Sequence, residues 1–159
     1  MKIIVDSREQ VPLDFTRYEA TVEPGALEVG DYAPAGLGHL CAVERKSLPD
    51  LIASLTWERE RFERELRRAR GLEAFAVVIE GNLAQVRSHD YRSQAKPHAV
   101  LQSMVVFSCR YGVNWIWADD AAGAAYFTFH FLRHYVREAE GHYKAIVKAH
   151  GEHYASPES

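Results

Sequence analysis

Residues 30–50 read GDYAPAGLGHLCAVERKSLPD, and this stretch decides the fold prediction. Residues 27–32 and 40–44 have the composition of strands, while Pro34 and two glycines supply the loop between them. The pattern therefore predicts a β-hairpin. Its second arm runs directly into Glu-Arg-Lys, so charged side chains stand where a packed strand is expected.

Four acidic residues stand within or at the ends of predicted strands: Asp6, Asp31, Glu44 and Glu80. A carboxylate on a packed strand is costly unless it is paired or bound to a metal. Lys46 lies two residues beyond Glu44, and therefore on the same face of the strand. Pairing of the hairpin arms would let Asp31 and Glu44 share one hard cation such as Mg²⁺ or Mn²⁺. Such an ion activates water and stabilises phosphate charge. Glu80 precedes a glycine and can equally begin a turn.

Helices and strands alternate along the rest of the chain. Ser47 is a suitable N-cap for a helix over residues 48–55, with Asp50 in its first turn. Early strands followed by alternating helix and strand predict an α/β fold, with a mixed central sheet and helices on both faces. Apolar patterning predicts helices over 57–70, 95–110 and from 119 or 120 to 136, and strands over 2–6, 18–22, 75–79 and 113–117.

The chain has 159 residues, a formal net charge of -3, and 47% apolar and 26% charged residues, which is typical of one globular domain. Its two cysteines are too few for a disulfide framework or a four-thiolate zinc site. No apolar run could span a membrane and no signal peptide is evident, so we expect a cytoplasmic protein, or a nuclear one in a eukaryote. Mild acidity argues against a charge-driven coat for nucleic acid, but it is compatible with a nuclease whose acids hold a cation.

Other patterns have an ordinary structural interpretation. His130 and His134 have the spacing of helical zinc ligands, but no catalytic Glu follows His130 and no third ligand is evident, so we expect a structural role. Trp115 and Trp117 share one face of a strand and are expected in the core, with base stacking as the alternative. The Glu- and Arg-rich run at 59–70 predicts a solvated helix face, with phosphate contact as the alternative.

The spacing of the charged residues resembles the nuclease motif of the XPF family of structure-selective DNA endonucleases. In this sequence the motif consists of Gly30-Asp31, twelve residues, Glu44-Arg45-Lys46, three residues and Asp50. It is a variant of the acidic residue and Asp/Glu-x-Lys pattern of the restriction-endonuclease-like superfamily. The resemblance runs from about residue 2 to about residue 136, and it includes Val5-Asp6-Ser7-Arg8-Glu9, Arg61 and Val78-Ile79-Glu80-Gly81.

This resemblance implies a restriction-endonuclease-like fold and a Mg²⁺-dependent phosphodiesterase, with Mn²⁺ as a substitute. Under the family pattern, Asp31 and Glu44 are metal ligands. Asp6 is a further ligand or a close second acid. Lys46 orients the attacking water or stabilises developing charge.

The same resemblance gives supporting roles to residues around this centre. Asp50 either adds to the site or caps the helix that follows it. Four residues would support the site or contact the DNA backbone: Arg8, Glu9, Arg45 and Arg61.

Partners and domain organisation follow from the same resemblance. We expect a nuclease domain over residues 1–138 and a tail over 139–159 that is helical or disordered. The tail is too short for the tandem helix-hairpin-helix module of many members, so a separate DNA-targeting subunit could select the substrate. The expected substrate is branched, flap or fork DNA, in repair and recombination. The alternative is a catalytically silent DNA-binding or scaffold subunit, but a scaffold has little reason to keep mutually repelling carboxylates.

Aromatic residues crowd the predicted C-terminal helix. Four aromatics within six consecutive helical positions cannot all face one core, and the preceding helix adds further apolar residues. We therefore expect a homodimer through a self-complementary patch built by both C-terminal helices. The residues of this patch are Met104, Val105, Phe107, Tyr126, Phe127, Phe129 and Phe131.

Overall fold

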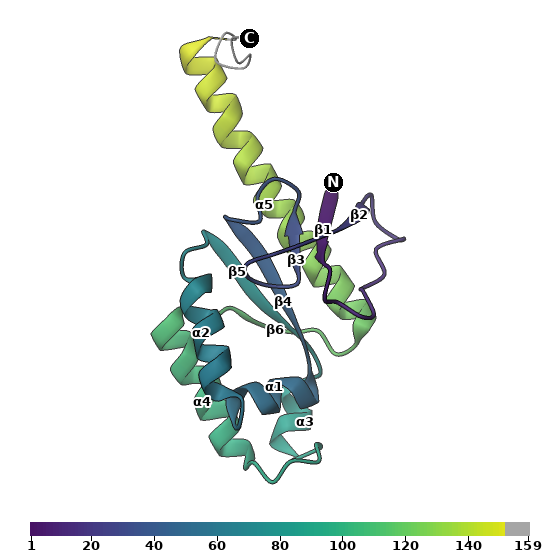
Figure 1. Ribbon diagram of the computed structural model, residues 1–159, viewed down its shortest axis with the longest axis vertical. Helices are drawn as coiled ribbons and strands as arrows, with labels where there is room; N and C mark the ends of the chain where they lie inside the picture. The colour runs from purple at the N-terminus through teal and green to yellow at the C-terminus, as the bar shows by residue number, and fades with distance from the viewer. Residues whose placement is uncertain (152–159) are drawn as a thin grey trace.

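A mixed sheet of six strands forms the centre of the molecule in the computed structural model, which describes residues 1–151 (Figure 1). The strand order is β2-β1-β3-β4-β5-β6. Strand β3 runs antiparallel to β1 and β4, and the other neighbouring pairs are parallel. A hairpin is therefore confirmed, formed by β3 and β4, but its first arm is Tyr32–Pro34 rather than residues 27–32, so Pro34 belongs to the strand and not to the loop. The strands are β1 (Lys2–Asp6), β2 (Thr21–Gly25), β3 (Tyr32–Pro34), β4 (Cys41–Ser47), β5 (Ala74–Glu80) and β6 (Trp115–Trp117).

Helices cover both faces of the sheet, as predicted. Four helices lie on one face and the long C-terminal helix lies on the other (Figure 1). Within residues 1–151, no helix combines the length and apolar character that crossing a membrane requires. The helices are α1 (Leu48–Leu55), α2 (Arg59–Ala69), α3 (Leu83–Arg87), α4 (Pro97–Tyr111) and α5 (Ala121–His150).

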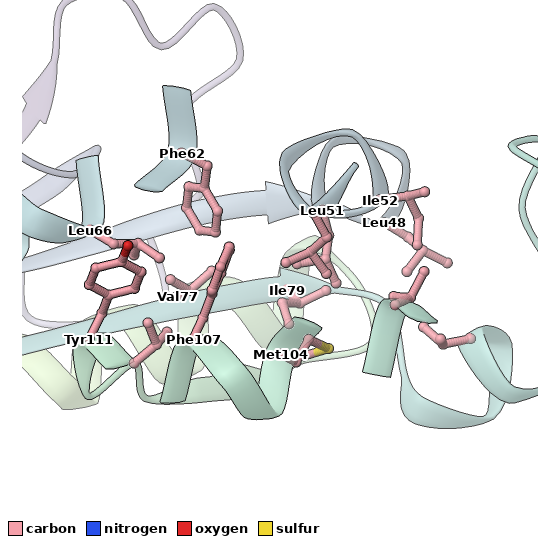
Figure 2. Close-up of a cluster of buried hydrophobic side chains, with 14 residues drawn as sticks. Leu48, Leu51, Ile52, Phe62, Leu66, Val77, Ile79, Met104, Phe107 and Tyr111 are labelled. Carbon is pink, nitrogen blue, oxygen red and sulfur yellow. The ribbon is translucent and has the colours of Figure 1, made fainter. Parts of the chain in front are cut away.

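Two apolar cores result from the alternation of side chains along β5. Val77 and Ile79 pack under α1, α2 and α4, together with Phe62 and Phe107 (Figure 2). Val78 points to the other face, where it packs with residues of α5. Strand β5 is thus buried on both sides, which explains its continuous apolar sequence.

The two helices of the predicted dimer patch lie on opposite faces of the sheet, so that patch is wrong as a single surface. Met104 and Phe107 of α4 belong to the core with α1 and α2, whereas Phe129 of α5 belongs to the other core. Tyr126 and Phe127 remain exposed, which confirms that the aromatics of α5 cannot all face one core. Apolar periodicity identifies a helix face but does not say which side of the sheet it covers.

Some boundaries differ from the prediction for identifiable reasons. Strand β2 continues through Pro24, because an edge strand can lack one backbone N–H without losing a ladder hydrogen bond. The short helix α3 was not predicted. It is held by a capping box in which Asn82 and Gln85 each accept a hydrogen bond from the other's backbone N–H.

Helix α5 runs without a break across the expected boundary between residues 138 and 139, and reaches His150. Its C-terminal part projects beyond the sheet (Figure 1), and residues 140–146 are all exposed. The first part of the predicted tail is therefore helical. The remainder of that tail, residues 152–159, lies outside the described residues.

Candidate active site

A glycine with left-handed backbone sets the position of Asp31. Gly30 has φ of +78°, and a Cβ there would lie 3.0 Å from the carbonyl oxygen of Val43. The N–H of Asp31 donates to that same oxygen at 2.8 Å. Its Oδ2 accepts from the backbone N–H of Arg45 at 2.8 Å. The Gly-Asp pair thus fixes one carboxylate against strand β4.

Glu44 and Lys46 project from β4 toward α1 and α2. Their neighbours in register on β5 are Val77 and Ile79, which belong to the core on that side. The Nζ of Lys46 lies 3.3 Å from Oε1 of Glu44, and the two side chains are 14% and 10% exposed. Lys46 also lies over the ring of Phe62, 4.8 Å from its centre. The predicted acid and amine therefore stand together in a mostly buried position.

A third carboxyl group, that of Glu65 on α2, completes the cluster. It lines the same cavity as Glu44 and lies close enough to raise the pKa of that residue. The sequence prediction missed Glu65, because it treated the acidic residues of the run at 59–70 as solvated. One signal was available: Glu65 lies between Phe62 and Leu66, the buried positions of this helix, and therefore beside its buried face.

Burial and repulsion by neighbouring acids raise the pKa of Asp31 and of Glu44. Burial raises the pKa of Asp31 to about 6, against the opposing hydrogen bond from the Arg45 N–H. Burial and the neighbouring Glu65 raise the pKa of Glu44 well above its ordinary value. For Lys46, burial opposes the charge, but Glu44 and Glu65 outweigh it, and the pKa is raised. Three acids thus surround one ammonium group, so the positive charge of Lys46 is too small to balance the negative charge of the three carboxylates.

Glu44, Lys46 and Glu65 line a cavity of about 330 Å³ between β4, α1 and α2. Asp31 is not part of its wall, but its charge raises the pKa of Glu44. Asp50 lies on its wall, in the first turn of α1, and Ser47 caps that helix by accepting from the Asp50 N–H at 3.2 Å. The cap role suggested for Asp50 is therefore wrong, because Ser47 caps the helix, and Asp50 instead places a further acid at the cavity. Arg61 lies at the same cavity, 3.9 Å from Glu58, with its side chain 79% exposed.

Asp6 lies at the end of β1, and its carboxylate accepts four hydrogen bonds from N–H groups of Arg8 and Leu27. The carboxylate is 2% exposed and accepts from the Arg8 backbone N–H, Nε and Nη2 at 3.0, 2.7 and 3.1 Å. It also accepts from the Leu27 N–H at 3.0 Å. The Arg8 guanidinium is the largest cause that lowers the pKa of Asp6 to about 2. Asp6 therefore holds Arg8, whose charge interacts with Asp31 and Glu44. A metal-ligand role for Asp6 stays a prediction.

Arg45 alternates with Glu44 and Lys46 and points to the opposite face of β4. Its guanidinium donates to Glu80 and, at 3.1 Å, to Glu9. The hydroxyl of Tyr32 also donates to Glu9, at 2.6 Å. This network ties β3, β4 and β5 to the turn after β1, on the face of β4 opposite to Glu44 and Lys46. Arg45 and Glu9 are each 18% exposed, so they support the sheet from within.

The remaining sequence patterns have structural roles. His130 contacts the rings of Tyr126 and Tyr18. Trp115 and Trp117 pack against the core of α1, α2 and α4, as predicted. Across residues 1–151, no three His, Cys, Asp or Glu side chains already converge as cation ligands.

Comparisons with known proteins are consistent with this geometry. Residues 5–131 match the family model described as the ERCC4 domain. XPF from Aeropyrum pernix has a TM-score of 0.68 and 24% identity, over 84% of this chain and 60% of that chain. The same protein in complex with DNA has a TM-score of 0.69 and 23% identity, over 86% and 66%. The chain thus spans less than two thirds of either solved chain, and the likeness confirms the fold. No curated protein matches.

Proposed function

Because the chain belongs to the ERCC4 domain family, the family of the XPF nuclease domain, we propose that it is an endonuclease that hydrolyses phosphodiester bonds of DNA. The observation that carries this proposal is the cavity in which Glu44 and Glu65 face a single lysine, Lys46, with the Asp31 carboxyl interacting electrostatically with Glu44 and Lys46. Neighbouring carboxyls with raised pKa are destabilised by one another unless a proton or a cation lies between them. We propose that the cation is Mg²⁺, with Mn²⁺ as a substitute.

The donor set fits a hard divalent cation. Asp31 and Glu44 offer carboxylate oxygens, which Mg²⁺ prefers, and Glu65 lies within reach as a third acid. A bound divalent ion would supply an activated water and would stabilise charge on the phosphate. Glu44, whose pKa is raised by burial and by its acidic neighbours, must be ionised to hold it. We infer that the ion compensates the negative charge that these neighbours place around Glu44.

Lys46 has a separate role in this proposal. Its ammonium group is fixed by Glu44 at 3.3 Å and by the ring of Phe62, and the raised pKa keeps it charged at neutral pH. A fixed positive charge at this position would orient the attacking water and stabilise the transition state. Arg8 and Arg61 are exposed beside the cluster, and we propose that they contact the DNA phosphates.

We propose branched, flap or fork DNA as the substrate, with a second copy of this chain completing the enzyme. Phe127 lines a shallow apolar groove on α5 together with His130 and Phe131, and Tyr126 is 50% exposed beside it. This surface of α5 alone would form the dimer contact, in place of the two-helix patch. A self-complementary contact there would place two active sites in a fixed relation along DNA.

The test is an assay of the purified protein on single-stranded, flap, fork and Holliday-junction DNA, with and without Mg²⁺. We expect metal-dependent cutting of at least one branched substrate, and no cutting by the Asp31→Asn variant. Binding of these DNAs without cutting, in Mg²⁺ and in Mn²⁺, would favour the silent DNA-binding subunit instead.

A further inference from the structure

A second and larger cavity, of about 860 Å³, lies beside the catalytic cavity. Its walls come from α1, the turn at residues 56–58, α3 and the segment after α3. Asp50 and Glu58 line both cavities, so the two are contiguous. The volume is that of a ligand site rather than a packing defect. A strand of DNA whose phosphate lay at Glu44 would continue into this space.

Trp57 stands on the wall of this second cavity. It occupies the turn between α1 and α2, one residue before Glu58, and it is 69% exposed. The buried residues Leu48 and Ile52 supply an apolar floor next to it. An exposed indole beside an apolar floor offers a flat stacking platform that the fold itself does not use.

The opposite wall is held in place by the segment after α3. Tyr91 stacks on His89 with ring centres 4.3 Å apart, and its hydroxyl donates to the carbonyl oxygen of Ala95 at 2.6 Å. Tyr91 therefore needs no reordering when a ligand enters. A cavity with one fixed aromatic wall and one exposed indole suits a flat ring.

The charges of the lining select which part of a nucleotide enters. Four acids line the cavity, Asp50, Glu58, Glu80 and Asp90, of which Glu80 is paired with Arg45. Arg92 is the one basic side chain among the described lining residues. The acids disfavour a phosphate in the cavity but can accept hydrogen bonds from the N–H edges of a base. Arg92 is exposed and is available for a phosphate outside.

We propose that this cavity takes one unpaired nucleobase of the strand being cut, stacked on Trp57, next to the scissile phosphate. The proposal rests on the proposed DNA nuclease function and adds the state of the substrate: a base in a duplex is already stacked and paired, whereas an unpaired base enters without that cost. The cavity thereby favours substrates that are single-stranded on one side of the cut.

The experiment uses fork DNA with 2-aminopurine placed, one position at a time, through the unpaired arm and the first paired bases. Binding is followed by fluorescence in EDTA, so that no cutting occurs. We expect quenching at one or two adjacent positions next to the site that the enzyme cuts in Mg²⁺. Trp57→Ala should remove this quenching and weaken binding at least about fivefold, and Trp57→Phe should restore part of both.

Tyr143→Ala is the matched control, because Tyr143 is 51% exposed on the projecting part of α5. It should leave the affinity and the quenching unchanged. Quenching and affinity that are equal in wild type and Trp57→Ala would overturn the base cavity, even if the enzyme cuts DNA normally. Quenching that depends on Trp57, in a protein that cuts no DNA, would instead uphold the cavity and refute the nuclease function.

Discussion

Glu44 on β4 and Glu65 on α2 are both acids, yet they lie close enough for Glu65 to raise the pKa of Glu44. Two carboxylates at such a distance repel each other unless a proton or a cation compensates their charge. Burial and this neighbour therefore both favour the protonated form of Glu44 in the absence of metal. Metal binding and proton release are coupled at this site, and the predictions that follow use this coupling.

Divalent metal should stabilise the native protein. If the cation binds the folded state through Asp31 and Glu44, the melting temperature rises with Mg²⁺ or Mn²⁺ concentration. Asp31→Asn and Glu44→Gln should abolish this rise, whereas Glu140→Gln, which changes an exposed residue of α5, should keep it. Equal shifts in the wild type and both site variants would rule out the metal site.

Without metal, the contribution of Asp31 to stability should fall as the pH rises. Its pKa is about 6 when folded, against 3.8 as the ordinary value. Between these values the folded state binds a proton that the unfolded state has released, so raising the pH through this window destabilises the fold. Thermal melts of wild type and Asp31→Asn in EDTA isolate the pH-dependent contribution of Asp31 to stability. The stability of the variant relative to wild type should increase from pH 4 to above pH 6, and a constant difference would contradict the prediction.

Lys46→Ala should separate catalysis from binding. Removing the ammonium group should lower turnover by on the order of 10²-fold or more while DNA affinity stays within a few-fold. Single-turnover cleavage and equilibrium binding measure the two effects. Should affinity fall as far as turnover, Lys46 binds the phosphate and does not act in the chemical step.

Asp6→Asn should affect stability without affecting metal binding. The amide cannot accept the same four N–H groups, and we expect a loss of about 1–3 kcal/mol in the free energy of unfolding. The stabilising contribution of Asp6 is present above its ordinary pKa and is lost as the pH falls toward about 2. The melting shift produced by Mg²⁺ should be unchanged. Loss of that shift would make Asp6 a ligand after all.

Phe127→Glu should give a monomer. Phe127 is 38% exposed on α5, so the change should leave the cores intact while placing a charge in the proposed dimer contact. Analytical ultracentrifugation at micromolar concentration measures the assembly, and metal-induced stabilisation checks that the site remains. A wild-type protein that is monomeric and fully active would show that no dimer is required.

The sequence predicts the centre of this site because its geometry is local. Gly30 and Asp31 directly precede one arm of a hairpin and Glu44 and Lys46 lie on the other, and antiparallel pairing alone brings them together. Glu65 could not be found this way. Its position depends on how α2 packs against β4, which no short-range pattern in the sequence specifies.

The prediction that α4 and α5 build one common surface failed for a related reason. The apolar faces of α4 and α5 are equally visible in the sequence, but a strand such as β5, apolar throughout, accepts helices on either side. The family resemblance supplies the connection order and so the fold. It does not show which of the aromatics of α5 remain exposed.

Helix α5 fixes a distance between its projecting part and the candidate active site. At 30 residues it is about 45 Å long, and its first half packs against the sheet while residues 140–146 are exposed. A partner that bound these exposed residues would be held at a set distance and rotation from the candidate active site. One residue inserted after Gly141 would turn the C-terminal end of the helix by about 100° and advance it by about 1.5 Å. The length of this single helix therefore sets the distance between a partner bound at its projecting part and the candidate active site.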